Sequence, residues 1–419
     1  MSIEAPNESD SARPMDQQDG RLSEHKGLRG FIKGSITSIK DGELGFLPVV
    51  IGLIIIGVIF QSLNSTFLSP ANLSNLLMQS AAVGVIALGI VCVLLVGEID
   101  LSVGSVSGLS AAIFAVFLIN LGLPTIVGII AAITAGAIIG LIYSFISNRF
   151  GVPSFVITLA GLLAFAGLQI LVLKPAGTIN IPFDSPLVNF GQLAFVPSLI
   201  SYLLCALLAG GYFISRGKLA RSRAKGNLSH RSYKSIALAA FAMFAVLAGV
   251  SAYLNQGRGI GWMFITFLAL VLFMNHLLMR TSWGRSVFAV GGNKEAARRS
   301  GINVRLVYVS VFVACSTLAA IGGLFAAGRL ASAAQSSGGG DTNLTAIAAA
   351  VIGGTSLFGG RGSAFSALLG VIVITAIANG LILLNLESDV RYMVTGGVLL
   401  LAVTLDAVSR RARTAHGRA

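Results

Sequence analysis

A succession of uncharged apolar runs, such as Leu76–Val96 and Ser105–Ile119, restricts the fold of this chain more than any other feature. About 20 apolar residues in a helix span the hydrocarbon core of a bilayer. Of the 419 residues, 55% are hydrophobic and only 11% are charged, whereas a soluble domain has about 25% charged residues. The sequence therefore predicts an all-α integral membrane protein.

We expect ten to twelve transmembrane helices, some of them broken. The approximate spans of twelve segments are 46–63, 72–97, 101–120, 124–147, 153–174, 195–214, 234–254, 260–279, 305–328, 342–357, 363–384 and 390–408. The basic residues lie mainly in alternate loops, which is the positive-inside pattern and predicts that both termini are cytoplasmic. Because these cations do not form one patch, the net charge of +13 does not indicate nucleic-acid binding.

The two ends of the chain differ in composition from the part between them. Residues 1–45 are polar and of mixed charge, and they predict a disordered cytoplasmic tail without the early apolar run of a signal peptide. Residues 46–410 form the predicted transmembrane domain, and residues 411–419 form a basic cytoplasmic tail. The three cysteines lie in apolar runs without metal-binding spacing, so we expect small core residues there.

Two carboxylates, Glu98 and Asp100, lie where two apolar runs join. Charges are costly in hydrocarbon, so they require a protein-buried or water-lined setting. Asp100 can cap the following helix, a structural interpretation that leaves Glu98 unexplained. Alternatively, Glu98, Asp100 and Ser102 line a polar path for a sugar-like solute. Gly104 and Gly108 have the GxxxG spacing that lets another helix approach closely.

A second break, Gly353–Gly362, interrupts the apolar runs near the C-terminus. Like the first, it is rich in glycine and serine and leads into a helix of small residues. Broken segments in corresponding halves indicate a transport site in repeat-built transporters. Glycine-rich turns are also common between membrane helices, so both interpretations stay open for Gly353, Thr355 and Ser356.

The segment Gly291–Val304 predicts a short, well-capped helix in an inner loop. Asn293 is a good N-cap, Glu295 suits the first turn, Arg298 suits the last turn and Gly301 suits the residue after the cap. Such a helix between two membrane segments is suited to docking on a soluble partner. The alternative is an interfacial helix that only follows the positive-inside rule.

Four stretches together resemble the permease subunits of ATP-binding-cassette (ABC) sugar importers of the ribose/arabinose/xylose type. They are Phe67–Leu77, Glu98–Ser105, Gly291–Val304 and Gly353–Gly362, and the resemblance covers about residues 46–410. Within the family the chain looks most like the D-xylose branch. Glu98 stands where many relatives have glycine, Val152–Gly161 is similar to that branch, and residues 195–259 form an extra helical region with a basic cytoplasmic loop, 215–234.

The resemblance implies a non-enzymatic transport subunit in the bacterial inner membrane, importing D-xylose or another pentose by alternating access. ATP hydrolysis would belong to a separate ATP-binding subunit, because the chain has no GxxxxGK[ST] motif, and the chain itself would bind no cofactor or metal. The other implied partners are a periplasmic or lipoprotein sugar-binding protein, a second copy of the permease and the lipid bilayer.

The resemblance also assigns site residues. The loop 280–304 would couple to the ATPase subunit through Gly292, Asn293, Glu295, Ala296, Arg298, Gly301 and Ile302. The substrate pathway would include Glu98, Asp100, Ser102, Gly104, Gly353, Thr355 and Ser356.

Two other classes of protein compete with this interpretation. A secondary sugar transporter would use Glu98 or Asp100 as a proton carrier. An intramembrane enzyme would need a metal or nucleophile cluster, but the four histidines are scattered along the chain.

Overall fold

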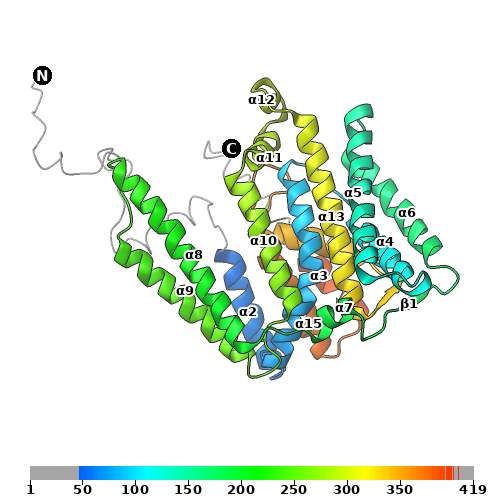
Figure 1. Cartoon of the computed structure of the whole chain (residues 1–419), viewed down its shortest axis with the longest axis horizontal. Coiled ribbons are helices and arrows are strands. Elements are labelled where there is room, and N and C mark those ends of the chain that lie inside the picture. Colours follow the sequence, from blue (N-terminus) through cyan, green and yellow to red (C-terminus); the bar gives the residue numbers. More distant parts are fainter. Residues whose placement is uncertain (1–46, 392, 399, 401–403, 405–419) are drawn as a thin grey trace, which may run out of the picture. The chain divides into compact units, whose positions relative to one another are not determined.

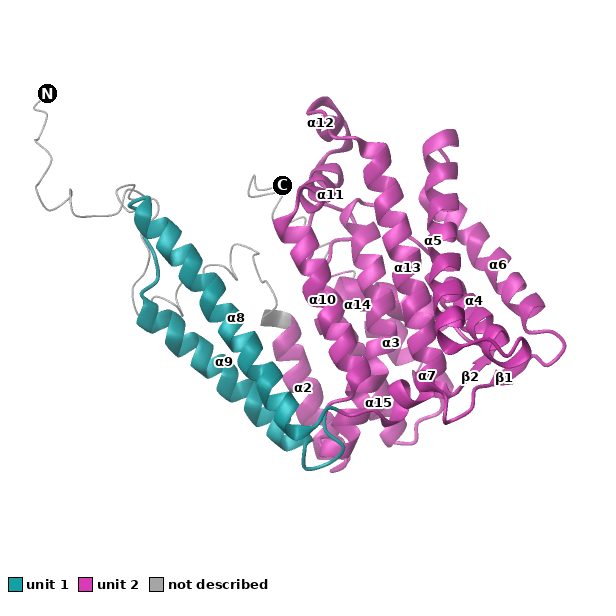
Figure 2. Ribbon diagram, viewed as in Figure 1, with its two compact units in different colours: residues 1–44, 196–259 teal, residues 45–195, 260–419 magenta. Residues whose placement is uncertain are grey.

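The computed structural model describes residues 47–391, 393–398, 400 and 404, and the chain divides into two compact units. Unit 1 comprises residues 1–44 and 196–259, and unit 2 comprises residues 45–195 and 260–419 (Figures 1 and 2). The two predicted tails, 1–45 and 411–419, lie outside the described residues.

Unit 2 is built around two helices, α3 (Pro70–Leu95) and α13 (Val304–Leu330). Most of the apolar stretch of α3 is buried, whereas most of that of α5 and α6 is exposed, as lipid-facing helices require. Figure 2 shows the helices of this unit running alongside one another. Its other helices are α2 (Leu47–Leu63), α4 (Val103–Ala115), the π-turn η3 (Val116–Asn120), α5 (Thr125–Phe150), α6 (Ser154–Val172), α7 (Pro186–Val188), the π-turn η4 (Asn189–Leu193), α10 (Trp262–Arg280), α11 (Ser282–Gly292), α12 (Lys294–Arg299), α14 (Gly340–Ile352) and α15 (Ala364–Leu383).

Small residues allow α5 to pack directly on α13. A Cβ added to Gly136 would lie 2.6 Å from the carbonyl oxygen of Ser316, and one added to Gly140 would lie 2.6 Å from that of Phe312. The two backbones therefore touch along one helix turn, as GxxxG spacing permits.

Two short strands, which the sequence analysis did not predict, close one end of unit 2. β1 (Thr178–Asn180) pairs antiparallel with β2 (Ser332–Ala334), and Ile179 lies opposite Ala333. β1 begins shortly after α6 and β2 shortly after α13, so the strand pair connects the ends of these two helices. Three-residue strands leave too little periodicity to be found in a sequence.

Unit 1 is a hairpin of two long helices, α8 (Ser198–Lys225) and α9 (Tyr233–Leu254). Two polar contacts connect the helices: Cys205 Sγ lies 3.3 Å from Ser251 Oγ, and the Asn255 side chain donates to Ser201 Oγ at 3.2 Å. The predicted span for α8 ended at residue 214, but the helix continues to Lys225. Lysine, arginine and alanine are strong helix formers, so the helix outlasts its apolar run.

The predicted membrane segments match the positions of the helices better than they match the lengths of the helices. In the described part of the chain, nine helices are long and apolar enough to cross a membrane, and the apolar helices at 49–63 and 341–352 are shorter. The predicted segment 342–357 ends earlier than expected, because residues 353–357 belong to the break. The predicted segment 390–408 lies only partly within the described residues. The predicted loop 280–304 contains a further helix, α11, capped by Thr281.

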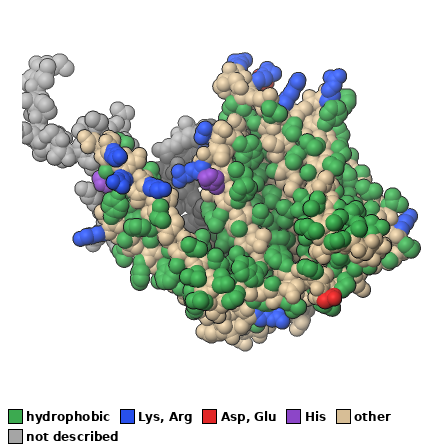
Figure 3. Space-filling model, viewed as in Figure 1, with side chains coloured by type: hydrophobic (Ala, Val, Ile, Leu, Met, Phe, Trp, Pro, Cys, Tyr) green, Lys and Arg blue, Asp and Glu red, His purple; other side chains and the backbone are tan. Residues whose placement is uncertain are grey.

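Charged side chains are concentrated at one end of unit 2. Figure 3 shows Lys and Arg side chains gathered at the end that carries α12, and hydrophobic side chains covering most of the flank below. This distribution is the one expected of a protein whose flank faces lipid and whose end faces water.

Candidate functional site

The two chain breaks predicted from the sequence meet in unit 2, beside the start of the loop helix α12. The amide of Gly360 donates to the carbonyl of Leu95 at 2.9 Å. A Cβ added to Gly359 would lie 2.9 Å from the amide nitrogen of Gly97, and one added to Gly291 would overlap the Leu95 carbonyl. Three segments distant in sequence therefore pass one another at backbone contact, which only glycine allows here.

Glu98 is half-buried and connects this junction to two neighbouring helices. Its carboxylate accepts a hydrogen bond of 2.6 Å from the Tyr308 hydroxyl on α13 and one of 2.5 Å from the Ser154 hydroxyl at the start of α6. The ammonium of Lys294, the first residue of α12, lies over the Tyr308 ring at 4.7 Å from its centroid. A continuous line of contacts thus runs from α12 through Tyr308 to Glu98.

Asp100 is fully buried and is held by its neighbours. One carboxylate oxygen accepts hydrogen bonds from the backbone amide and the hydroxyl of Ser102, at 2.8 and 2.7 Å. The Cys315 thiol donates to the other oxygen at 3.7 Å, and the Tyr143 hydroxyl donates to Ser102 at 2.7 Å. The cap of α4 is Ser102, and Asp100 completes the turn before it.

Beyond Ser102, two buried polar side chains, Asn343 and Gln169, lie beside α4. The amide of Gly104 donates to the side chain of Asn343 on α14 at 2.5 Å. The Gln169 amide, on α6, donates to the carbonyls of Ala334 and Ser337 at 2.8 and 2.9 Å. Both Asn343 and Gln169 are almost completely buried.

Sequence reasoning missed Gln169, Asn343, Tyr308 and Ser154. A signal existed for the first two, because polar residues within membrane spans are rare and face the protein interior. Tyr308 and Ser154 gave none, since both lie at helix ends, where such residues are common.

The second break is held differently. Thr355 is buried, and within the described part of the chain its hydroxyl has no hydrogen-bond partner. Ser356 is half-buried: its amide donates to the carbonyl of Arg361 at 3.0 Å, and its hydroxyl accepts from the amide of Phe358 at 3.2 Å. A Cβ added to Gly353 would overlap the carbonyl of Ser366, so this turn lies directly against α15.

The loop helix α12 is confirmed as the sequence predicted it. Asn293 is its N-cap and accepts from the amide of Ala296 at 2.9 Å, and Glu295 pairs with Arg298 at 2.7 Å. Gly301 follows the C-cap with φ +86°. Ala297 alone in this helix is buried, and Ile302 is half-buried. The other predicted loop residues face outward: Gly292, Asn293, Glu295, Ala296, Arg298 and Gly301.

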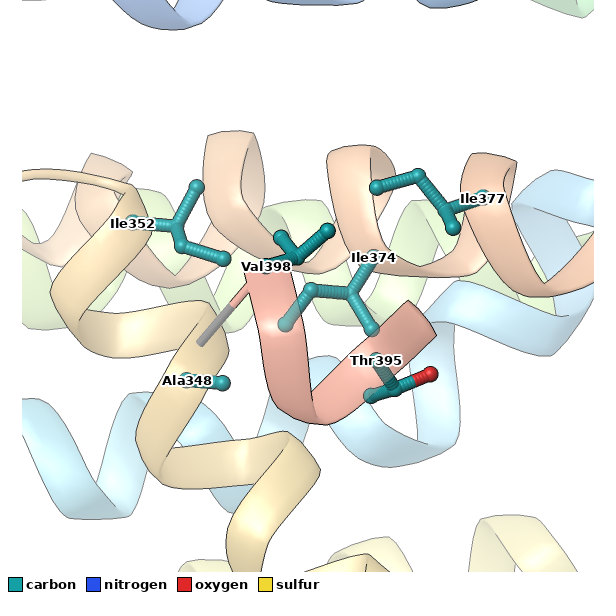
Figure 4. A pocket seen from close by; sticks show the side chains of 6 residues that line it. All are labelled: Ala348, Ile352, Ile374, Ile377, Thr395 and Val398. Atoms are coloured by element: carbon teal, nitrogen blue, oxygen red, sulfur yellow. The ribbon is translucent and has the colours of Figure 1, made fainter. Parts of the chain in front are cut away.

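An apolar pocket lies between α14, α15 and residues 395–398 (Figure 4). It is lined by Ala348, Ile352, Ile374, Ile377, Thr395 and Val398. Among the described lining residues Thr395 provides the only polar side chain, and its hydroxyl donates to the carbonyl of Arg391. Because a sugar needs several polar partners, this pocket is unsuited to one.

The described residues contain no group of His, Cys, Asp and Glu side chains that could hold a metal ion. The carboxylates of the junction are engaged with hydroxyls, amides and a thiol. The arrangement connects the two breaks to an outward-facing helix, which suits transmission of movement rather than covalent chemistry.

Comparisons with known proteins identify the family of this chain. Residues 72–403 match the family model described as branched-chain amino acid transport system / permease component. The chain is 38% identical over 370 residues to the xylose transport system permease protein XylH of Haemophilus influenzae, covering 87% of this chain and 97% of the relative. It is 35% identical over 381 residues to XylH of Escherichia coli, covering 90% and 95%.

The chain is also 34% identical over 366 residues to the ribose import permease protein RbsC of Bacillus subtilis, covering 87% of this chain and 94% of the relative. No solved structure matches the chain. The family match covers most of the chain, and nine helices of the described part have membrane-spanning length and composition. The chain therefore belongs to this family of permease components and is a multi-pass membrane transport protein, not an enzyme.

Proposed function

We propose that this chain is the membrane subunit of an ABC importer and that it carries a monosaccharide, D-xylose or a related pentose, into the cell. The two xylose permeases and the Bacillus subtilis ribose permease compared above align over at least 94% of their own length. The xylose permeases are the more similar of these, and this favours xylose as the first substrate to test.

A separate ATP-binding subunit supplies the energy in this proposal, because the chain lacks a P-loop of its own. The observation that carries the proposal is the connection of α12 to the junction. The helix turns all but one of its side chains outward, where a soluble subunit can bind them, and Lys294 contacts Tyr308, the hydrogen-bond partner of Glu98.

Transport follows an alternating-access cycle in this mechanism. Closure of two ATP-binding subunits displaces α12, and Tyr308 passes the displacement to Glu98 and the first break. The second break moves with it because Gly360 is bonded to Leu95. When the junction opens, the sugar hydroxyls meet the polar groups of its two halves, which are Glu98, Asp100, Ser102, Gly104, Gly353, Thr355 and Ser356.

The proposed assembly has two copies of this chain, two ATP-binding subunits and a sugar-binding protein on the opposite membrane face. The end that carries α12 is cytoplasmic, as are both termini. Exposed cations at helix ends, Arg149, Arg280 and Arg305, support this orientation through the positive-inside rule.

The test is ATP-dependent uptake of radiolabelled xylose, ribose and arabinose in vesicles that contain this chain, its ATP-binding subunit and its binding protein. We expect xylose uptake that stops when the ATP-binding subunit is omitted. Uptake that continues without that subunit and follows a proton gradient would contradict the proposal. Glu98 and Asp100 would then be examined as proton carriers.

A further inference from the structure

Two buried amide side chains, Gln169 and Asn343, hold one segment of unit 2 against α4. The segment is 335–339, which connects β2 to α14. The Gln169 side chain donates to the carbonyl of Ser337 at 2.9 Å, and the Asn343 side chain, just beyond the segment, accepts from the amide of Gly104 at 2.5 Å. The segment is therefore fastened to α6 on one side and to α4 on the other.

The segment lies toward the membrane face opposite α12. The helix α13 has 27 residues and is about 40 Å long at 1.5 Å per residue. The loop helix α12 precedes its start and β2 follows its end, and Figure 2 shows α12 and β2 at opposite ends of unit 2. Since the proposed orientation places α12 in the cytoplasm, the segment belongs to the outer half of the transport path.

Backbone contact closes the space between the segment and α4. A Cβ added to Gly338 would overlap the carbonyl oxygen of Gly104, and one added to Gly108 would overlap that of Ser337. Gly338 has φ +67°, a conformation that favours glycine. Ser107 lies beneath Gly338 and is only 3% exposed. A solute therefore cannot pass between the segment and α4 in this arrangement.

The groups that hold the segment have the chemistry that a pentose requires. A primary amide both donates and accepts hydrogen bonds, as does a serine hydroxyl, and all of these groups are neutral. Sugar hydroxyls can therefore replace the backbone groups of the segment as partners of Gln169 and Asn343. A buried amide without a partner is destabilising, so a sugar that supplies the replacement bonds favours opening of the segment.

We propose that Gln169 and Asn343 bind sugar hydroxyls in the outer half of the path, and that the segment 335–339 occupies their place until the sugar arrives. This role rests on the proposed function, because it takes a pentose as substrate and α12 as cytoplasmic. It extends the path outward from the first break, since Asn343 is bonded to Gly104, two residues after Ser102. In the competing explanation the two amides only fasten the segment.

The first experiment measures selectivity among D-xylose, D-ribose and L-arabinose, which differ only in the configuration of their hydroxyls. Each sugar is supplied at a concentration that saturates the binding protein, in vesicles that contain the full-length chain and its ATP-binding subunit. Gln169→Leu and Asn343→Leu should lower xylose uptake by about fivefold or more and change the ratio of xylose to arabinose uptake by about threefold or more. The ratio changes because the lost hydrogen bonds affect differently placed hydroxyls unequally.

Gln192→Leu is the matched control. The Gln192 side chain is half-buried in η4 and donates to the carbonyl of Arg329 at 2.8 Å, so this substitution also removes a glutamine amide from a backbone carbonyl. It should leave the ratio unchanged. If Gln169→Leu does not fold, Gln169→Asn keeps the amide on a shorter side chain and should change the ratio in the same direction.

The second experiment detects opening of the segment from outside. Ser107→Cys places a thiol beneath the segment, and Ser80→Cys places one at a buried serine of α3 whose hydroxyl also donates to a carbonyl three residues earlier. Right-side-out vesicles loaded with ATP are treated with a membrane-impermeant maleimide, and the labelling of the parent protein is subtracted. Xylose-loaded binding protein should speed labelling of Ser107→Cys by about tenfold or more and leave that of Ser80→Cys unchanged.

Two results would overturn this role of the amides. Equal losses for all three pentoses in Gln169→Leu and Asn343→Leu mean that the amides only fasten the segment. Protection of the Ser107→Cys thiol while xylose uptake proceeds means that the sugar passes elsewhere. Both results leave the proposed function intact, whereas xylose uptake that persists without the ATP-binding subunit contradicts that function and not the binding of sugar by the two amides.

Discussion

The two breaks that meet at the junction are built in opposite ways. In the first, 97–102, side chains make the connections: Glu98 is bonded to Tyr308 and Ser154, and Asp100 to Ser102 and Cys315. In the second, 353–362, the described contacts with neighbouring segments are close backbone contacts, and four glycines have positive φ, which are Gly354, Gly359, Gly360 and Gly362. The first break is thus joined to α6 and α13 by side-chain hydrogen bonds, whereas the second packs closely against its neighbours through its glycine backbone.

This difference predicts which kind of substitution destabilises each break. A change of polar group should disturb the first break, and a change of volume should disturb the second and the glycine junction. The two carboxylates also differ in burial. Asp100 is fully buried, whereas Glu98 is half-buried and is hydrogen-bonded to Tyr308, which contacts Lys294 of α12.

The largest effect is expected from Gly291→Ala, because the added methyl group overlaps the carbonyl of Leu95. Overpacking of this kind typically costs about 1–3 kcal/mol, so the melting temperature in detergent should fall and folded yield should drop. The neighbouring Gly292→Ala is the matched control, since nothing lies within 4 Å of its added Cβ. Equal stability of the two variants would contradict the close contact.

A second prediction compares the buried polar groups of the two breaks. Asp100→Ala leaves the amide and hydroxyl of Ser102 without their acceptor and should cost about 1–3 kcal/mol of stability. Thr355→Val removes a hydroxyl for which the described residues offer no partner, so it should be neutral or slightly stabilising. Thermal melts of both variants check this, and a strongly destabilised Thr355→Val would show that the hydroxyl is in fact engaged.

The third prediction concerns Glu98 and Tyr308, which we expect to affect transport more than assembly. Glu98→Gln and Tyr308→Phe should each lower sugar-stimulated ATP turnover several-fold, and the double variant should lose little more, because contacting residues are coupled. Tyr233→Phe, at an exposed tyrosine of unit 1, is the control.

If the losses of turnover add up in the double variant, Glu98 and Tyr308 act independently of each other. Loss of the assembled complex with Glu98→Gln alone would instead favour a purely structural role for this carboxylate.

Much of this architecture was predictable from the sequence, and what was missed has physical causes. Apolar runs located the membrane helices, and cap residues located α12 almost to the residue. Composition marked the end of the apolar run at residue 214 but not the end of α8, because helix propensity continues through lysine and arginine. Apolar patterning likewise passed over α11, which lies in a loop of mixed polarity.

The candidate site was predicted in part. The two breaks and their glycines were identified, but nothing in the sequence places Gly97, Gly291 and Gly360 together, because their contact depends on tertiary packing. The same holds for Glu98 with Tyr308, residues 210 positions apart. The two interpretations of Asp100 also differ only in its surroundings: the structure describes a buried, bonded carboxylate, and its part in a sugar pathway stays a prediction.

The smallest effect on stability is expected at the outer surface of α12. Glu295 and Arg298 form an ion pair whose side chains are 59% and 70% exposed, and exposed pairs are typically worth about 0–1 kcal/mol. Glu295→Ala/Arg298→Ala should therefore leave the melting temperature nearly unchanged while reducing co-purification with the ATP-binding subunit. Unchanged binding and unchanged sugar-stimulated turnover would exclude this surface as the docking site. The contacts from Lys294 through Tyr308 to Glu98 would then have no role in coupling to an ATP-binding subunit. The difference between the two breaks would in that case matter for folding and not for transport.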